Sequence, residues 1–493
     1  MTTSRLADIV SGPLTEPLRP SGAPTRRRWS RRVAIDVVGL FDCAVVVLAV
    51  VLTGLFYATF FDMAFRPMQA VQSGLGLALI VHICLRSAGN YDVDQLHALP
   101  ARPLTLLSCL FIALIAVRGL GLPFAPTGTI FWLWALVWML VALCLMSLIR
   151  FAAACILSRA NMDGRFDTRV AVFGAGAVAR RVHDHLSNGI TGVRFVGVFD
   201  DRACEDRLNP DGLTVSGRLD DLVVAARDDK IDKIIIALPQ QAEGRITTVA
   251  RRLEHLPVSI HIVTHLASDL IAEGPAYHVS NLGAVGLLDV KTKPLSDWSP
   301  IVKRAEDLLI ASVLLVLALP LMAIIALAIR INSPGTVFFT QRRRGLNGRV
   351  FNVLKFRTMS VLEDDARVSQ ARVKDPRVTS VGWFLRRTSL DELPQLWNVL
   401  RGDMSLVGPR PHALVHDDMW GEMLERYANR HQVKPGITGL AQVRGWRGAT
   451  ETIDKLEHRV ACDLEYIAKW SLWLDLWILL QTIRTVLGGR NAH

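Results

Sequence analysis

The chain has 493 residues, of which 51% are hydrophobic and 20% charged, and its formal net charge is +11. This length exceeds one ordinary domain and allows about three units of roughly 150 residues each. The apolar residues gather in long uncharged runs, which excludes a purely soluble protein and predicts a membrane protein. The seven cysteines form no C-x-x-C pair, so neither a zinc site nor a disulfide framework is expected.

The N-terminal third predicts a tail followed by a membrane region. Residues 1–32 are rich in proline and arginine and are expected to be a disordered cytoplasmic tail. Four transmembrane helices are expected within residues 33–157. Two uncharged runs, 43–61 and 130–149, match the roughly 20 residues needed to cross a bilayer, and two weaker runs are 70–85 and 104–122. The arginines before the first run place the N-terminus in the cytoplasm, and an even number of crossings returns the chain there.

Residues 165–290 predict an α/β domain. Strand patterns at residues 168–174, 195–201, 233–239 and 258–264 alternate with helical segments. Such alternation is typical of a parallel sheet with helices on its faces. We therefore expect a Rossmann-like middle domain.

A glycine-rich turn in this domain resembles a dinucleotide site. Gly174 and Gly176 follow the first strand and open a helix, while Asp200 ends the second strand. In dinucleotide-binding proteins such glycines admit a pyrophosphate and the acid binds a ribose. The alternative is a turn kept for packing, in a domain that serves assembly or regulation. A nicotinamide-dependent enzyme would usually add Tyr-x-x-x-Lys, which no tyrosine here provides.

An uncharged run from about 308 to 330 is long enough to span a bilayer but contains Pro320. Lys303 and Arg304 precede it and a cluster of arginines follows it. Positive charge on both flanks favours a helix that is broken at Pro320, enters one leaflet and returns, over a helix that spans. A re-entrant helix would keep everything after residue 330 at the cytoplasmic face.

After this run the sequence predicts a β-hairpin with Asn347-Gly348 at its tip. Its cations Arg343, Lys355 and Arg357 could neutralise phosphates, or could be ordinary surface charges. The surplus of positive charge in this C-terminal third suggests anionic headgroups and phosphorylated substrates as partners, or simply a solvated face. Nucleic acid is not expected, because the sequence has no motif for it.

The segment 389–411 holds the candidate catalytic residues. Asp391 and Glu392 are adjacent carboxylates, and Arg410 lies in the turn Gly408-Pro409-Arg410-Pro411. Neighbouring carboxylates in a first helical turn point about 100° apart, which suits two roles rather than one shared proton. One carboxylate could take a phosphoryl group while Mg²⁺, which accepts one or two protein carboxylates, screens the charge. The structural alternative is a capping box, with Ser389 as N-cap and Glu392 reaching back.

Two segments complete the C-terminal part. Residues 434–442, which begin with Lys434, form a glycine-rich loop whose amides suit a phosphate or uracil. Residues 463–487 place Tyr466, Trp470, Trp473 and Trp477 at helical spacing, which indicates one helix that is either interfacial or part of the core.

Taken together, these segments resemble the bacterial sugar transferases, the polyprenyl-phosphate hexose-1-phosphate transferases that start exopolysaccharide assembly. The resemblance covers the chain, with a monotopic catalytic domain at residues 298–493. It rests on the following matches: Lys303-Arg304, Pro320, Ser333-Pro334-Gly335, Gln341-x-Arg343-x-Gly345, Lys355-Phe356-Arg357-Thr358-Met359, Asp375-Pro376-Arg377, and the segments 389–411 and 434–442.

The resemblance implies transfer of a sugar 1-phosphate from a UDP-sugar to undecaprenyl phosphate, with Mg²⁺, at the cytoplasmic face of the bacterial inner membrane. Asp391 would be the nucleophile and Glu392 the metal ligand, with Asp391 beside it at the metal. The substrates would be bound by Arg410 and by further residues of the same domain, namely Lys355, Arg357, Asp375, Arg377 and Lys434. The middle domain would serve homodimerisation or regulation.

The sugar is expected to be glucose, because Gly445-Trp446-Arg447-Gly448 resembles the glucose-1-phosphate branch. That branch commonly has glutamate where Ala449 stands, so galactose or another UDP-sugar stays an alternative. From other classes, a membrane-bound NAD-dependent sugar-nucleotide enzyme and a non-catalytic assembly scaffold are the competing hypotheses.

Overall fold

The computed structural model divides the chain into two compact units, Met1–Phe166 and Asp167–His493. It describes residues 30–60, 66–91, 103–119, 129–187, 192–201, 213–263, 279–282, 285–291, 293–360, 376–424, 426–446, 448 and 452–487. The predicted tail, residues 1–32, lies almost wholly outside these ranges.

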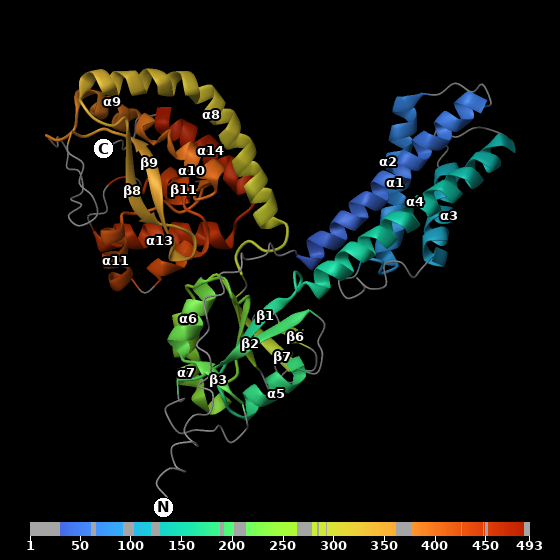
Figure 1. Cartoon of the computed structure of the whole chain (residues 1–493), viewed down its shortest axis with the longest axis horizontal. Helices are drawn as coiled ribbons and strands as arrows, with labels where there is room; N and C mark the ends of the chain where they lie inside the picture. The colour runs from blue at the N-terminus through green and yellow to red at the C-terminus, as the bar shows by residue number, and fades with distance from the viewer. Residues whose placement is uncertain are drawn as a thin grey trace, which may run out of the picture. The chain divides into compact units, whose positions relative to one another are not determined.

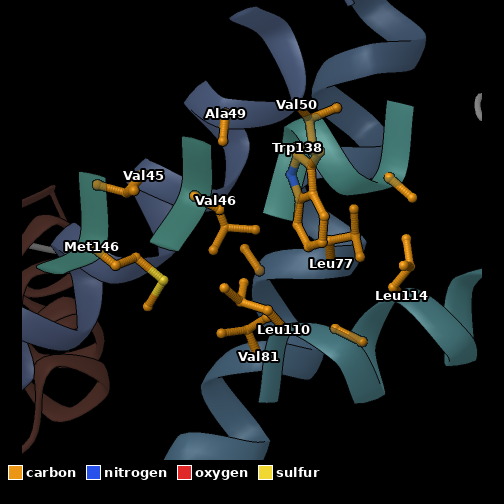
Figure 2. Close-up of a cluster of buried hydrophobic side chains, with 14 of the residues drawn as sticks. Val45, Val46, Ala49, Val50, Leu77, Val81, Leu110, Leu114, Trp138 and Met146 are labelled. Atoms are coloured by element: carbon orange, nitrogen blue, oxygen red, sulfur yellow. The ribbon is translucent and has the colours of Figure 1, made fainter. Parts of the chain in front are cut away.

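The first unit is made of four helices: α1 (Arg31–Phe60), α2 (Pro67–Ser87), α3 (Pro103–Gly119) and α4 (Thr129–Met162). Their shared core centres on Trp138, which packs with Val46, Leu77 and Leu110, all without solvent exposure (Figure 2). Helices α1, α2 and α4 are long and apolar enough to cross a membrane. Helix α3 has only 17 residues, about 26 Å by the helical rise, and falls short of a full span. Among the described residues, the fourth candidate span is α8 (Ser299–Asn332), which belongs to the second unit.

A buried ion pair joins the first and last helices of this unit. Arg150 of α4 and Asp42 of α1 are each 1% exposed, and their Nη2 and Oδ2 atoms lie 2.8 Å apart. Tyr91 donates a hydrogen bond of 2.8 Å to the same carboxylate oxygen. Because a charge among apolar helices is costly unless it is paired, this contact selects how α1 and α4 pack.

The second unit begins with a seven-stranded sheet in the order β3-β2-β1-β4-β5-β7-β6. Five strands run parallel, which confirms the predicted parallel sheet: β1 (Thr168–Phe173), β2 (Val193–Phe199), β3 (Val215–Gly217), β4 (Lys233–Ile236) and β5 (Ser259–Val263). Strand β3 was not predicted, nor was the antiparallel hairpin at the other side of the sheet, in which β7 (Val285–Lys291) pairs with β5 and β6 (Val279–Leu282) forms the edge. Helices α5 (Ala177–Ser187), α6 (Leu219–Arg227) and α7 (Glu243–Leu253) accompany the sheet.

Helix α8 (Ser299–Asn332) contains Pro320 and differs from the prediction in one respect. The helix is not broken there but continues to Asn332, and Figure 1 shows it bent into two limbs. A proline inside a helix removes one backbone hydrogen bond and causes such bends. Ala311 packs in one hydrophobic cluster of the C-terminal domain with Val353 and Leu396, while Ile325 and Ile329 pack in another with Phe356 and Leu385. Between these contacts Val316 and Leu317 are 65% and 72% exposed.

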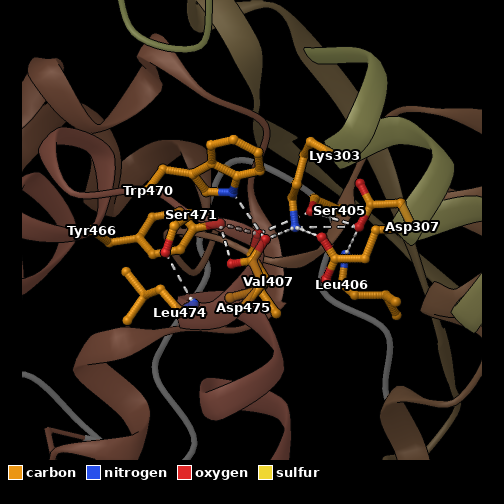
Figure 3. Close-up of polar contacts among 11 residues, drawn as sticks. Lys303, Asp307, Ser405, Leu406, Val407, Tyr466, Trp470, Ser471, Leu474 and Asp475 are labelled. Atoms are coloured by element: carbon orange, nitrogen blue, oxygen red, sulfur yellow. Dashed lines mark hydrogen bonds and ion pairs between the residues drawn. The ribbon is translucent and has the colours of Figure 1, made fainter. Parts of the chain in front are cut away.

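The N-terminal end of α8 is fixed by a buried polar network (Figure 3). The Nζ atom of Lys303 lies 2.6 Å from Oδ2 of Asp475, which is fully buried. Asp475 also accepts hydrogen bonds from Tyr466 and Trp470, and Asp307 accepts one from the Ser405 hydroxyl. Lys303 thus ties α8 to α14 (Leu472–Leu487), and Asp307 ties α8 to the strand that begins at Ser405.

Strands β8 (Phe338–Arg344) and β9 (Val350–Phe356) form the predicted hairpin, with Asn347 and Gly348 at positive φ at its tip. The remaining elements are α9 (Ser380–Thr388), η4 (Leu390–Glu392), α10 (Gln395–Arg401), β10 (Ser405–Val407), α11 (Leu414–Met423), η5 (Tyr427–Gln432), β11 (Gly436–Thr438), α12 (Leu440–Val443), α13 (Ile453–Ala468) and α14 (Leu472–Leu487).

The prediction of one continuous helix near the C-terminus is wrong, because α13 ends at Ala468 and α14 begins at Leu472. The change of direction turns the aromatic residues to different sides. Tyr466 is 3% exposed and bonds to Asp475, whereas Trp473 is 79% exposed.

Candidate active site

Asp391 and Glu392 lie in a short 3₁₀ turn between α9 and α10. Helix α9 ends at Thr388, and the next residue, Ser389, has a left-handed φ of 59° that reverses the chain direction. Ser389 makes no side-chain cap hydrogen bond to η4, and the Glu392 carboxylate bonds to two cations instead of reaching back. The capping-box alternative is therefore wrong, and the carboxylate pair is left for another use.

Glu392 is held by two cations from distant segments. Lys355 of β9 lies 2.7 Å from Oε1, and Arg410 donates to both carboxylate oxygens, including an Nη1 to Oε2 bond of 3.1 Å. Burial alone would raise the pKa of Glu392, but the charges and hydrogen bonds of Arg410 and Lys355 hold that pKa well below its ordinary value. Glu392 is therefore ionised at neutral pH.

Asp391 has the opposite electrostatic environment. Its side chain is 9% exposed, and burial raises its pKa above the ordinary value. The negative charge of Glu392 raises it further, while Lys355, Arg410 and Arg386 act against the rise. Burial of this kind removes water from around a carboxylate and leaves nearby cations to stabilise its ionised form.

Close backbone contacts fix the turn that carries Arg410. The Gly408 amide donates to the Thr438 carbonyl at 2.9 Å, and the Gly436 amide donates to the Pro409 carbonyl at 3.0 Å. A Cβ added at Gly436 would lie 2.1 Å from the Gly408 nitrogen, so only glycine fits there. The glycines of the 434–442 segment are thus required for packing against this turn.

Of the arginines around the pair, Arg343 was assigned from the sequence as a possible phosphate-binding cation, whereas Arg430 and Arg386 were not assigned. Arg343 of β8 donates to the carbonyl of Pro411, and burial together with the charge of Arg410 lowers its pKa to about 10. Arg430 of η5 donates to the carbonyl of Arg410 at 2.6 Å. Arg386 lies in α9, where its charge acts on Asp391. Only the fold brings these arginines together, since they come from three separate segments.

Other predicted binding residues are placed elsewhere. Arg357 donates to the carbonyls of Ser333 and Pro334 at 2.7 and 2.8 Å, so its guanidinium holds the turn after α8 rather than facing Glu392. Lys434 lies near Arg304 and Asp307, and burial lowers its pKa. The carbonyl of Arg377 accepts the Ser360 amide, and Asp375 lies outside the described residues.

In the glycine-rich turn of the middle domain, a backbone amide is already bonded to the carboxylate of Asp200. Gly174 has a φ of 111°, and a Cβ there would lie 2.8 Å from the Ala237 carbonyl oxygen. Asp200 accepts the Ala175 amide at 2.9 Å, one of the amides that a pyrophosphate would need. No atom lies within 4 Å of a Cβ placed at Gly176. Packing therefore accounts for Gly174, and Asp200 accounts for the Ala175 amide, whereas the open space at Gly176 gives that glycine no packing role.

The described residues contain no group of three or more His, Cys, Asp or Glu side chains that could hold a metal ion. Asp391 and Glu392 offer two carboxylates, which is the number that Mg²⁺ uses when substrate phosphates and water complete its shell. Both oxygens of Glu392 already contact Lys355 or Arg410, so a magnesium ion at this pair would share that carboxylate with the two cations.

Comparison with known proteins gives two family matches and several similar proteins. A bacterial sugar transferase model matches residues 298–489, and a CoA-binding domain model matches residues 86–264. A UDP-glucose:undecaprenyl-phosphate glucose-1-phosphate transferase of Caulobacter vibrioides is 53% identical over 191 residues, which are 39% of this chain and 72% of that protein. The chain belongs to the bacterial sugar transferase family.

Two further relatives extend the match beyond the C-terminal domain. A UDP-glucose:undecaprenyl-phosphate glucose-1-phosphate transferase of Escherichia coli K12 is 42% identical over 317 residues, 64% of this chain and 66% of that protein. A UDP-galactose-lipid carrier transferase of Erwinia amylovora is 32% identical over 384 residues, 73% of this chain and 76% of that protein. The chain thus spans just under two thirds of the Escherichia coli protein, and family members differ in the sugar named.

Proposed function

We propose that this protein transfers glucose 1-phosphate from UDP-glucose to undecaprenyl phosphate and releases UMP, which starts the assembly of an exopolysaccharide. The observation that carries the proposal is the buried pair of Asp391 and Glu392, with Glu392 paired to Lys355 and Arg410. The names of the Escherichia coli and Caulobacter relatives support the donor and the acceptor.

In the first step Asp391 acts as the nucleophile. Its carboxylate oxygen attacks the phosphorus that carries the sugar, and the bond from that phosphorus to the bridging oxygen breaks. UMP leaves with the electron pair of that bond, and the sugar phosphate stays on Asp391 as a mixed anhydride. In the second step an oxygen of undecaprenyl phosphate attacks the same phosphorus and releases the Asp391 carboxylate.

Lys355 and Arg410 balance the negative charges of Glu392 and of the incoming diphosphate. They sit on Glu392, next to Asp391, so a diphosphate that reaches Asp391 meets two cations already held in place. Cations that are fixed before the substrate arrives stabilise developing negative charge at little reorganisation cost. Arg410 thereby binds the phosphate of the nucleotide, and Lys355 keeps Asp391 available in its ionised form.

Magnesium is part of the proposal. Asp391 and Glu392 would hold the ion with the diphosphate oxygens, and the bound ion would supply charge neutralisation on the diphosphate. Addition of EDTA is expected to stop UMP release and Mg²⁺ in excess to restore it. Full activity in EDTA would contradict the requirement.

We infer that α8 is a re-entrant membrane helix, with the catalytic domain at the cytoplasmic face of the inner membrane. Both limbs of α8 pack on the catalytic domain, through Ala311 on one side of Pro320 and Ile325 on the other, while the residues between them expose apolar side chains. A straight helix of 34 residues would be about 51 Å long and would carry its two ends far apart. Cysteine labelling of Ser299 and Asn332 variants should find both on one side of the membrane.

The middle domain is proposed to be Rossmann-like and to serve homodimerisation or regulation rather than dinucleotide chemistry. The bond from the Ala175 amide to Asp200 supports this assignment, because it occupies an amide at the expected pyrophosphate position. A nicotinamide-dependent reaction would appear as absorbance change at the nicotinamide band with UDP-sugars, and none is expected.

The test uses purified protein with Mg²⁺, UDP-glucose and undecaprenyl phosphate. Release of UMP with formation of lipid-linked glucose phosphate is expected, and Asp391→Asn should abolish it. Labelled sugar phosphate on the protein before lipid is added would separate a two-step reaction from a ternary one. Full activity of Asp391→Asn would exclude Asp391 as nucleophile, and a donor panel with UDP-galactose and N-acetylated UDP-sugars would identify the sugar.

A further inference from the structure

The turn that carries Arg410 is supported from behind by a buried arginine. Arg430 is 3% exposed, and its Nη2 atom donates to the Arg410 carbonyl at 2.6 Å while lying 2.8 Å from Oδ2 of Asp463. Its Nη1 atom donates to the Tyr427 hydroxyl at 3.1 Å and contacts Nδ1 of His412. The planar guanidinium thus connects α13 and η5 with the turn.

The partners of Arg430 are themselves fixed. Tyr427 is 1% exposed and donates to Oδ1 of Asp417 in α11 at 2.5 Å. Asp463 is 4% exposed in α13 and keeps the charge of Arg430 paired. Because a buried guanidinium with several acceptors has one low-energy position, Arg430 presents a fixed donor to the Arg410 carbonyl.

The backbone of Arg410 has little freedom of its own. Pro409 precedes it and Pro411 follows it, and a residue before proline is restricted to extended conformations. The carbonyl of Arg410 is bound by Arg430, and the carbonyl of Pro411 is bound by Arg343. With both carbonyls held, the Arg410 side chain extends toward Glu392, to which it donates through two nitrogens.

We propose that Arg430 is a positioning residue for the nucleotide site, which sets the direction of the Arg410 guanidinium through the Arg410 carbonyl. The inference rests on the proposed function only in naming a uridine nucleotide as the ligand of Arg410. Among the contacts of the described residues, those of Arg430 lead to Arg410, His412, Tyr427 and Asp463, and none joins it to Asp391 or Glu392. Arg430 therefore acts through Arg410 rather than on the reacting atoms.

The test is a mutant cycle read by UMP binding to the full-length protein in detergent. Arg430→Lys keeps the positive charge, but the lysine cannot bond to the Arg410 carbonyl, Asp463 and Tyr427 at the same time. UMP affinity should therefore fall about tenfold, the effect expected for loss of one hydrogen bond that involves a charged group. In an Arg410→Ala background the same change should have less than about a twofold effect, because no guanidinium is left to position. The matched control is Arg444→Lys, an exposed arginine paired with Glu465, which should bind UMP like the wild type.

Equal losses of UMP affinity in both backgrounds would overturn the inference, and so would an unchanged affinity in Arg430→Lys. If Arg430→Lys does not fold, Asp463→Asn loosens the same guanidinium without removing it and should give the same dependence on Arg410. In turnover, Arg430→Lys should raise the KM for UDP-glucose and leave the KM for undecaprenyl phosphate unchanged. Absence of UMP release by the wild type would count against the proposed function alone, since the binding cycle does not require transfer.

Discussion

Lys355 is expected to set the pH range in which the carboxylate pair is ready to react. Burial raises the pKa of Asp391, and among the neighbouring cations Lys355 lowers that pKa most. Its Nζ atom lies 2.7 Å from Oε1 of Glu392. Lys355→Met removes this charge from a buried site without leaving a new polar group. The pKa of Asp391, already raised by burial, should therefore rise further.

The magnitude follows from the loss of one opposite charge at close range, which shifts a carboxyl pKa by about one unit or more. Asp391 must be ionised to attack phosphorus, so activity is lost as the pH falls through its pKa. The acid limb of the pH profile reports the joint titration of Asp391 and Glu392. In Lys355→Met this limb should move up by about one pH unit, so the rate at a pH below the limb should fall about tenfold.

The assay is UMP release at saturating UDP-glucose between pH 5 and pH 9, with the ionic strength held constant. Lys469→Met is the matched control, because Lys469 is 70% exposed and pairs only at the surface with Glu465. Its profile should match the wild type. A Lys355→Met profile with a lower rate but an unmoved acid limb would refute the role of Lys355 in the ionisation of the pair.

Three further changes test the parts of the fold that support the site. Lys303→Met should destabilise the detergent-purified protein by about 3–5 kcal/mol in thermal unfolding, because it leaves buried acids without their cation, and an unchanged melting temperature would contradict this. Arg150→Leu should be more destabilising than the double change Asp42→Asn with Arg150→Gln, which removes both charges of the pair. Gly436→Ala should abolish transfer, since its Cβ would meet backbone 2.1 Å away, whereas Gly421→Ala, with open space around it, should keep it.

The elements with local signals could be predicted from the sequence. Asn347-Gly348 at a hairpin tip needs only a positive φ and two flanking strands, and the structure has both. The parallel strands β1, β2, β4 and β5 of the middle domain were equally visible, because each is a short apolar run between turn residues, whereas the three-residue strand β3 was missed. The antiparallel strand β7 was missed as well, since its pairing with β5 depends on the return path of the chain.

The site was harder to predict because its contacts join distant segments. The pattern from Ser389 to Glu392 matches a capping box locally, yet Lys355 and Arg410 bind the Glu392 carboxylate at distances of 37 and 18 residues along the chain. Arg357 is, like Lys355, a cation of the predicted hairpin segment, but it bonds to the turn after α8. Sequence shows which cations are present, and only the fold shows which acceptors they reach.

The opposite pKa shifts of the two carboxylates favour separate roles for them. Glu392 carries two cations and stays ionised, so it can keep Arg410 in place and contribute a fixed negative charge to a metal ion. Asp391 is less stabilised as an anion and therefore gains more when a phosphorus atom takes its charge. Pairs of titratable groups whose surroundings push their pKa values apart commonly divide the chemistry in this way. The same argument requires that Arg410 stay on Glu392 rather than move to Asp391, which is the placement that Arg430 is proposed to secure.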